Sequence, residues 1–202
     1  MSRQVLLFVA ILACALFITT DTSAYQYDGI RWNGTSEIYY LHTSVSAWTS
    51  SIKAAGETWT KAGSKFSFVY KGTTDARVSW DEDDIDNKNI LMKGVLWGPE
   101  YAGILALNHT WYNTTTKRLI DSDIIFNSLS CLYLWVTDGS DDGYDVQDVA
   151  THEMGHSLQL GDLYSANDAE KTMYGYTDWG ETKKRTLHAD DIAGIKAIYG
   201  PK

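Results

Sequence analysis

Two histidines four positions apart flank a glutamate in the segment His152-Glu153-Met154-Gly155-His156. If this segment is helical, both imidazoles lie on one face, with Cβ atoms about 5–6 Å apart, and both can reach one zinc ion at about 2.0–2.1 Å. Glu153 then stands beside the metal's open side, where a carboxylate can take a proton from water and pass it to a leaving amine. A motif this short also occurs among the surface residues of amphipathic helices, so its surroundings decide between the two interpretations.

These surroundings resemble a known family. The segment 152–162, HEMGHSLQLGD, resembles the metzincin consensus, and the sequence around it looks most like the matrixin branch. In that family a third zinc ligand, His in most members and Asp in some, follows the second histidine by six positions. The resemblance therefore implies that His152, His156 and Asp162 bind zinc, with one position left for water.

Three more segments carry the resemblance. Residues 171–176, KTMYGY, resemble the Met-turn, in which Met173 forms an apolar floor beneath the metal. Residues 187–200 look like the C-terminal helix of matrixins, and residues 121–127 are similar to one of their sheet strands. The resemblance covers nearly all of the chain after residue 25 and implies a zinc-dependent endopeptidase that cleaves extracellular proteins.

The family also implies where a substrate lies. Residues 103–107 correspond to the edge strand that pairs with an extended peptide, an interaction with little side-chain preference. Residues 174–179, after the Met-turn, correspond to the wall of the pocket on the leaving-group side.

Two departures from the family pattern bear on activity. Gln159 stands where the family has a glycine with positive φ, a conformation that costs another residue about 1–2 kcal/mol, and Gly161 is expected to take over the turn. Asp162 replaces the usual histidine, and a carboxylate donates more charge and leaves the metal a weaker Lewis acid.

Three alternatives follow from these departures. The first is a catalytically impaired, matrixin-fold binding protein, and the second is a peptidase-like immunity or surface-interaction protein. The third is a gluzincin-type peptidase with Glu170 or Glu181 as third ligand, although neither lies in a recognisable second helix. Retention of Glu153 favours the enzyme, because a zinc-binding scaffold alone does not need that acid.

Three helices are expected to position these residues, over residues 44–62, 145–158 and 189–199. The first has an apolar face at helical spacing, and the last ends at Gly200-Pro201, a natural helix stop. Alternating, β-branched or aromatic runs predict the strands, which are residues 37–41, 66–70, 77–80, 103–107, 123–126 and 132–136. Together with the family resemblance, this indicates an α+β (α/β-like) metzincin-type domain with a twisted, mixed five-stranded sheet and three main helices.

Length and charge set the broad class. The chain has 202 residues, 44% of them apolar, which suits one soluble globular domain. Its formal net charge of -9 argues against nucleic acid and anionic membranes as partners. A protein or peptide substrate and a monomeric state are expected.

The N-terminus has a different composition. An apolar run from residue 5 to 18, followed by Thr22-Ser23-Ala24, predicts a signal peptide over 1–24 and a secreted mature domain over 25–202. The run is short for a membrane span, so an uncleaved anchor is the lesser alternative and no stable membrane association is expected after cleavage. After cleavage Cys131 is the only cysteine, which excludes an intramolecular disulfide, and no cysteine between the signal peptide and the histidine motif is left to cap the zinc of a zymogen.

Calcium and glycans are secondary possibilities. Residues 138–143 partly match a calcium loop but lack its bidentate Glu, so Ca²⁺ is a weak expectation beside Zn²⁺, and an exposed acidic loop is favoured. Three sequons for N-glycosylation begin at Asn33, Asn108 and Asn113, and they matter only in a host that has the machinery.

Overall fold

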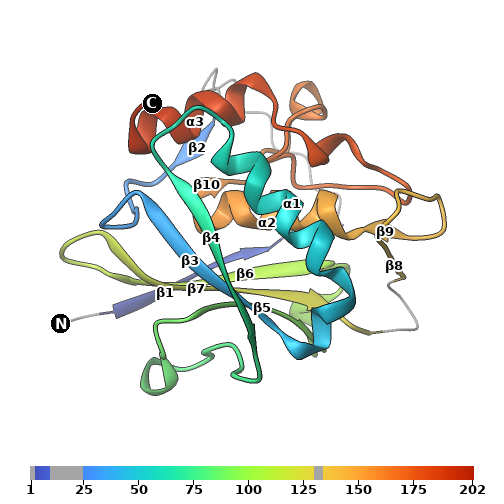
Figure 1. Ribbon diagram of the computed structural model, residues 1–202, viewed down its shortest axis with the longest axis horizontal. Helices are drawn as coiled ribbons and strands as arrows, with labels where there is room; N and C mark the ends of the chain where they lie inside the picture. The colour runs from blue at the N-terminus through green and yellow to red at the C-terminus, as the bar shows by residue number, and fades with distance from the viewer. Residues whose placement is uncertain (1–2, 10–24, 130–133) are drawn as a thin grey trace.

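A twisted mixed sheet runs through the molecule, with α1 and α2 across one face and α3 packed beyond them (Figure 1). The computed structural model describes residues 3–9, 25–129 and 134–202. The sheet has the order β1-β6-β7-β5-β3-β4. Its strands and the three α-helices are β1 (Arg3–Val9), β3 (Ser36–His42), β4 (Ser67–Thr74), β5 (Asn89–Gly94), β6 (Ala106–Asn113), β7 (Arg118–Asn127), α1 (Thr49–Thr60), α2 (Val146–Ser157) and α3 (Ala189–Tyr199).

The predicted α+β fold is confirmed, with one strand added. Strands β4, β3, β5 and β7 run parallel, and β6 is antiparallel to β7, which gives the expected mixed sheet of five strands. The sixth strand, β1, pairs antiparallel with β6 from Arg3 opposite Asn113 to Val9 opposite Leu107. It comes from the predicted signal peptide, whose residues 1–2 and 10–24 lie outside the described residues.

Not every predicted strand forms. Residues 77–80 are not a strand, because side chains rather than a neighbouring strand satisfy their backbone: Ser79 N–H donates to Asp123 Oδ2 and Ser79 C=O accepts from Trp111 Nε1. Strand β5, which the sequence did not predict, takes that place between two parallel neighbours. Side chains pack on both of its faces, so its residues do not alternate between buried and exposed.

Two further predictions on strands are corrected in position. The strand expected at 103–107 begins at Ala106 and continues to Asn113. Of residues 132–136, Trp135 and Val136 form β8, which pairs with β9 (Tyr144–Asp145) outside the main sheet, while 132 and 133 lie outside the described residues, as does Cys131.

The helices lie close to their predicted positions. The range 44–62 splits into a 3₁₀ turn, Thr43–Trp48, and α1, whose residues Ile52, Ala55 and Trp59 are fully buried. Helix α2 begins after Asp145, whose carboxylate accepts a hydrogen bond from Asp148 N–H at 2.9 Å. Helix α3 has the predicted bounds.

A buried polar contact joins the sheet to α2 within the largely apolar core. Asn108 of β6 is fully buried and points at α2, where its amide donates to the Glu153 carbonyl at 3.0 Å and to Ser157 Oγ at 2.9 Å. This fixes α2 against the sheet beside the two histidines. Within the described part of the chain, no helix has the length and apolarity needed to cross a membrane.

Candidate metal centre

Helix α2 brings His152 and His156 together. Both side chains are buried, and their Nε2 atoms are 3.2 Å apart. His152 Nδ1 lies 2.8 Å from the Thr172 carbonyl and His156 Nδ1 lies 2.8 Å from the Leu160 carbonyl. Because a carbonyl only accepts, each Nδ1 carries the proton, and each Nε2 keeps a lone pair directed at the same space.

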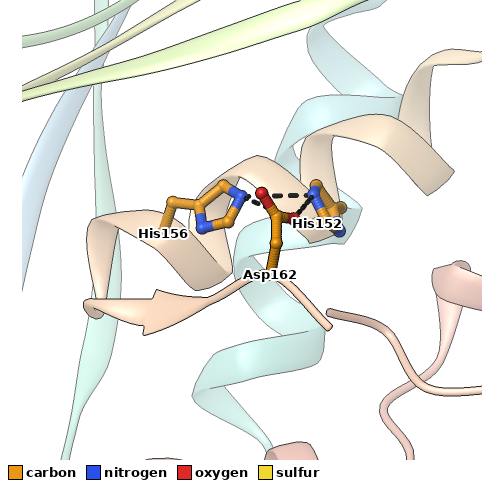
Figure 2. A group of neighbouring side chains, drawn as sticks. All are labelled: His152, His156 and Asp162. Atoms are coloured by element: carbon orange, nitrogen blue, oxygen red, sulfur yellow. Dashed lines mark hydrogen bonds and ion pairs between the residues drawn. The ribbon is translucent and has the colours of Figure 1, made fainter. Parts of the chain in front are cut away.

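The turn after α2 returns the chain to this space. Gln159 itself adopts φ 66°, so the expectation that Gly161 would take over the turn is wrong. The chain then forms β10 (Leu160–Gly161), which pairs antiparallel with β2 (Gln26–Tyr27). The next residue, Asp162, faces the two histidines (Figure 2).

The three side chains suit a zinc ion. Asp162 Oδ1 lies 3.1 Å from His152 Nε2 and 3.4 Å from His156 Nε2. Donors at about 2.0–2.2 Å from one ion, at tetrahedral angles, would lie about 3.3–3.6 Å apart, which is close to the three observed separations. Asp162 Oδ1 is also buried and has no hydrogen-bond partner, so it is available to a cation.

Glu153 lies beside the three donors. Its side chain is completely buried, and neither carboxylate oxygen has a hydrogen-bond partner. Burial raises the pKa of Glu153 to about 8, against the opposing effect of His156. An unsatisfied buried carboxylate is costly to keep, and such groups are common where a proton has to be moved.

The turn at residues 171–176 and the start of α3 support the two histidines. Met173 is buried with its side chain against Gly155, between the two histidines on α2, as predicted for the Met-turn. Asp191, in the first turn of α3, accepts hydrogen bonds from Thr172 N–H at 3.0 Å and Met173 N–H at 3.3 Å. Helix α3 therefore fixes the turn whose Thr172 carbonyl orients His152.

The alternative ligands lie elsewhere. Glu170 pairs with Lys183, and Glu181 pairs with Lys183 and Lys184. Among the described residues, His152, His156 and Asp162 form the one group of three or more His, Cys, Asp or Glu side chains close enough to share a metal. The described residues of 138–143 do not form such a group.

Tyr164 is a neighbour of the site that sequence reasoning did not single out. Its hydroxyl donates to Asp162 Oδ2 at 3.1 Å, and its ring, 48% exposed, stands edge-on to Tyr176 at 5.5 Å. Its position two residues after a candidate ligand was a possible signal in the sequence. Tyr176 belongs to the segment 174–179 expected to form a pocket wall.

The chain matches known proteins in sequence. A family model described as matrixin matches residues 31–200. Matrilysin from Rattus norvegicus is 41% identical over 66 residues, which are 33% of this chain and 24% of that protein. Metalloendoproteinase 1-MMP from Arabidopsis thaliana is 38% identical over 72 residues, 33% of this chain and 19% of that protein. The chain thus spans about a quarter or less of the length of these relatives.

Proposed function

The chain belongs to the matrixin family, and on that premise we propose that it is a zinc-dependent endopeptidase that hydrolyses peptide bonds of extracellular proteins. His152, His156 and Asp162 would hold the metal. The observation that carries the proposal is the buried, unpartnered carboxylate of Glu153 beside this three-donor set. Metal binding alone does not need such a carboxylate, whereas hydrolysis does.

The residues divide the work of hydrolysis between them. Zinc, when bound, supplies a Lewis acid that makes water a nucleophile near neutral pH and polarises the substrate carbonyl. Glu153 takes a proton from the attacking water and later gives it to the leaving amine. Asn108 holds the Glu153 backbone carbonyl, and the Thr172 and Leu160 carbonyls keep both histidines in the tautomer that frees Nε2.

An extended peptide is the proposed substrate. Residues 103–105 precede β6 and residues 106 and 107 begin it, next to the strand edge along which backbone pairing can hold a peptide. Strand β1 pairs with the continuation of that edge, from Leu107 to Asn113. Pairing at the edge would hold the peptide backbone independently of sequence, and recognition of a side chain beside Tyr176 would add selectivity.

Secretion completes the proposal. The composition of residues 1–24 supports a cleaved signal peptide, and the mature domain would then be 25–202. Cleavage would also remove β1 from β6. The net charge of -9 supports a protein substrate rather than nucleic acid, and we propose a monomer as the working form.

The direct test is digestion of casein or gelatin by protein that carries one zinc per chain. Proteolysis should stop with a chelator and return with added zinc. Glu153→Gln should keep its zinc yet lose turnover by about 10²–10⁴-fold, because proton transfer is lost while the ligands remain. Wild-type activity in Glu153→Gln at equal zinc content would refute the role of Glu153. A zinc-saturated wild type that binds peptides without cleaving them would favour the impaired binding protein.

A further inference from the structure

A buried lysine, Lys184, links α2 to residues 174–179, the wall segment that is expected to border the substrate pocket. Lys184, in the 3₁₀ turn Lys183–Arg185, is only 3% exposed. Its Nζ donates to the Tyr176 carbonyl at 2.5 Å and pairs with Glu181 Oε1 at 3.3 Å. The cation is thus aimed at the backbone of the wall segment rather than at solvent.

Asp148 ties the same segment to α2. Its side chain is fully buried in the first turn of the helix that carries His152 and His156. One carboxylate oxygen accepts from the Lys184 N–H at 2.7 Å and the other accepts from Thr177 Oγ1 at 3.3 Å. Thr177 is therefore anchored to the helix directly through its hydroxyl, and Tyr176 indirectly, through the bond from its carbonyl to Lys184.

The wall reaches the metal site through its aromatic rings. The Tyr176 ring stands edge-on to that of Tyr164, whose hydroxyl bonds to Asp162. A side chain at Gly175 would collide with the Tyr164 ring, so the wall backbone passes close against that ring. A shift of the Tyr176 carbonyl would consequently move a ring that borders the candidate third ligand.

Packing alone does not account for a lysine here. Burying an ammonium group carries a desolvation penalty that pairing offsets only where the geometry is good, and a methionine of similar length would fill the space without that penalty. A directional bond to one carbonyl offers what an apolar side chain lacks, which is a fixed position for the backbone.

We propose that Lys184 is a positioning residue for substrate selectivity: it fixes the Tyr176 backbone and so sets the shape of the pocket for the substrate side chain after the scissile bond. The inference rests on the proposed endopeptidase function. Lys184 makes no hydrogen bond or ion pair with the metal ligands or Glu153 among the described interactions. Its charge does act electrostatically on His152 and Glu153, but that effect is the same for every peptide, so a change in selectivity has to act through Tyr176.

The test compares Lys184→Met with Lys183→Met, the same change at a more exposed neighbour. Each zinc-loaded protein is assayed on peptides that differ only in the residue after the scissile bond. In Lys184→Met the kcat/KM ratio between the best and the worst peptide should fall at least about fivefold, mainly through KM, because a loosened wall discriminates less. Zinc content should stay at one per chain, and Lys183→Met should keep the wild-type ratio.

A second variant covers loss of folding. Thr177→Val removes the other anchor while Lys184 stays in place beside Asp148 and Glu181, and it should lower the same ratio in the same direction, by about twofold or more. If Lys184→Met does not fold, Thr177→Val decides alone. An unchanged ratio in the folded variants, or an equal loss of kcat/KM on every peptide, would overturn the inference.

Affinity provides a readout without turnover. Peptide hydroxamates with the same series of side chains bind a zinc site directly. The ratio of Kd between the weakest and the tightest hydroxamate should fall in Lys184→Met by a factor similar to that of the kcat/KM ratio. A wild type that cleaves no peptide at full zinc occupancy would sink the proposed function, while these ratios would still test Lys184.

Discussion

At the scale of single residues, the turn that follows α2 concentrates strain in one place. Gln159 holds φ 66°, a left-handed conformation that favours glycine. Its side chain offers partial compensation, since Nε2 donates to the His156 carbonyl at 3.1 Å while Oε1 is buried without a partner. The strain is tolerated because this turn carries the chain toward Asp162.

A glycine variant is usually less stable than an alanine variant, and at position 159 this order of stability should be reversed. Gln159→Gly should be more stable than Gln159→Ala by about 1 kcal/mol, because only glycine relieves the left-handed strain. At Lys53, exposed in α1, the alanine variant should be the more stable one by about 1 kcal/mol. Urea unfolding of the zinc-free proteins measures both differences. Alanine above glycine at both sites would contradict the assigned strain.

Asp162 carries a second prediction at this scale. In Asp162→Ala the Kd for zinc should rise about 100-fold or more, because two imidazoles alone form an incomplete site. Asp162→His should keep its zinc, since imidazole is also a good ligand. Alanine at Glu170 or Glu181 should leave zinc content unchanged after dialysis against a competing chelator. Zinc loss from Glu181→Ala, with tight binding in Asp162→Ala, would instead indicate a gluzincin-type site.

At the scale of elements, a two-stranded ribbon supports the metal loop. Strand β2 pairs with β10, the two residues directly before Asp162. The Gly161 backbone passes so close to Gln26 that an added Cβ would lie 3.0 Å from the Gln26 Cβ. The first residues of the proposed mature domain thus support the segment that carries the candidate third ligand, Asp162.

The exact N-terminus should therefore matter for metal retention. A chain that starts at Asp28 lacks β2 and should release zinc about 10-fold faster than one that starts at Tyr25, because β10 loses its partner. Removing Pro201 and Lys202 deletes a similarly short pairing at the other terminus, with Ser64, and should leave zinc release unchanged. Equal release rates from the two N-terminal forms would show that β10 needs no support.

Elements whose apolar residues recur at a clear helical or strand spacing, or that end at a clear stop signal, could be predicted from the sequence, and others could not. The apolar face of α1 and the stop after α3 carry local signals, so both helices lie near their expected bounds. Strand β5 does not alternate because both its faces are buried, and residues 77–80 alternate but find their partners in side chains. Strand β5 is decided by its pairing with β3 and β7, and residues 77–80 by bonds to side chains of β7 and β6, all of them far along the chain.

For the candidate site, spacing and family pattern were informative. The residues 152, 156 and 162 lie within ten positions, and the structure brings them together. The link from Lys184 to Tyr176 and Asp148 was not predictable, because it depends on how the segment after the Met-turn folds back on α2. No local pattern distinguishes Lys184 from Lys183.

At the scale of the whole molecule, buried carboxylates on the far side of the sheet make stability depend on pH. Asp121 and Asp123 of β7 are buried together, and Asp123 accepts from Ser79 N–H and Ile90 N–H, each at 2.8 Å. Burial, reinforced by Asp86, raises the pKa of Asp121 to about 7. Burial and the Asp121 charge raise the pKa of Asp123 well above its usual value.

The sign of the effect follows from proton binding. Between about pH 4 and 7 the folded chain keeps a proton on Asp121 that the unfolded chain has released, so stability falls as pH rises through this range. One such proton contributes about 1.4 kcal/mol per pH unit. Asp121→Asn should show a flatter decline in unfolding free energy from pH 4.5 to 7.5, measured in urea without zinc. An identical slope in the variant would mean that Asp121 is ionised throughout.

The burial of Asn108 has a consequence for the choice of production host. Asn108-His109-Thr110 is a glycosylation sequon, and oligosaccharide transfer acts on chains that have not yet folded. A glycan on Asn108 could not be accommodated, because the folded protein uses that amide to hold α2 against β6. In a yeast or animal secretory pathway, every chain modified there would be trapped as a misfolded glycoprotein. Bacterial export avoids the loss, and abolishing the acceptor with Thr110→Val should recover yield in a glycosylating host.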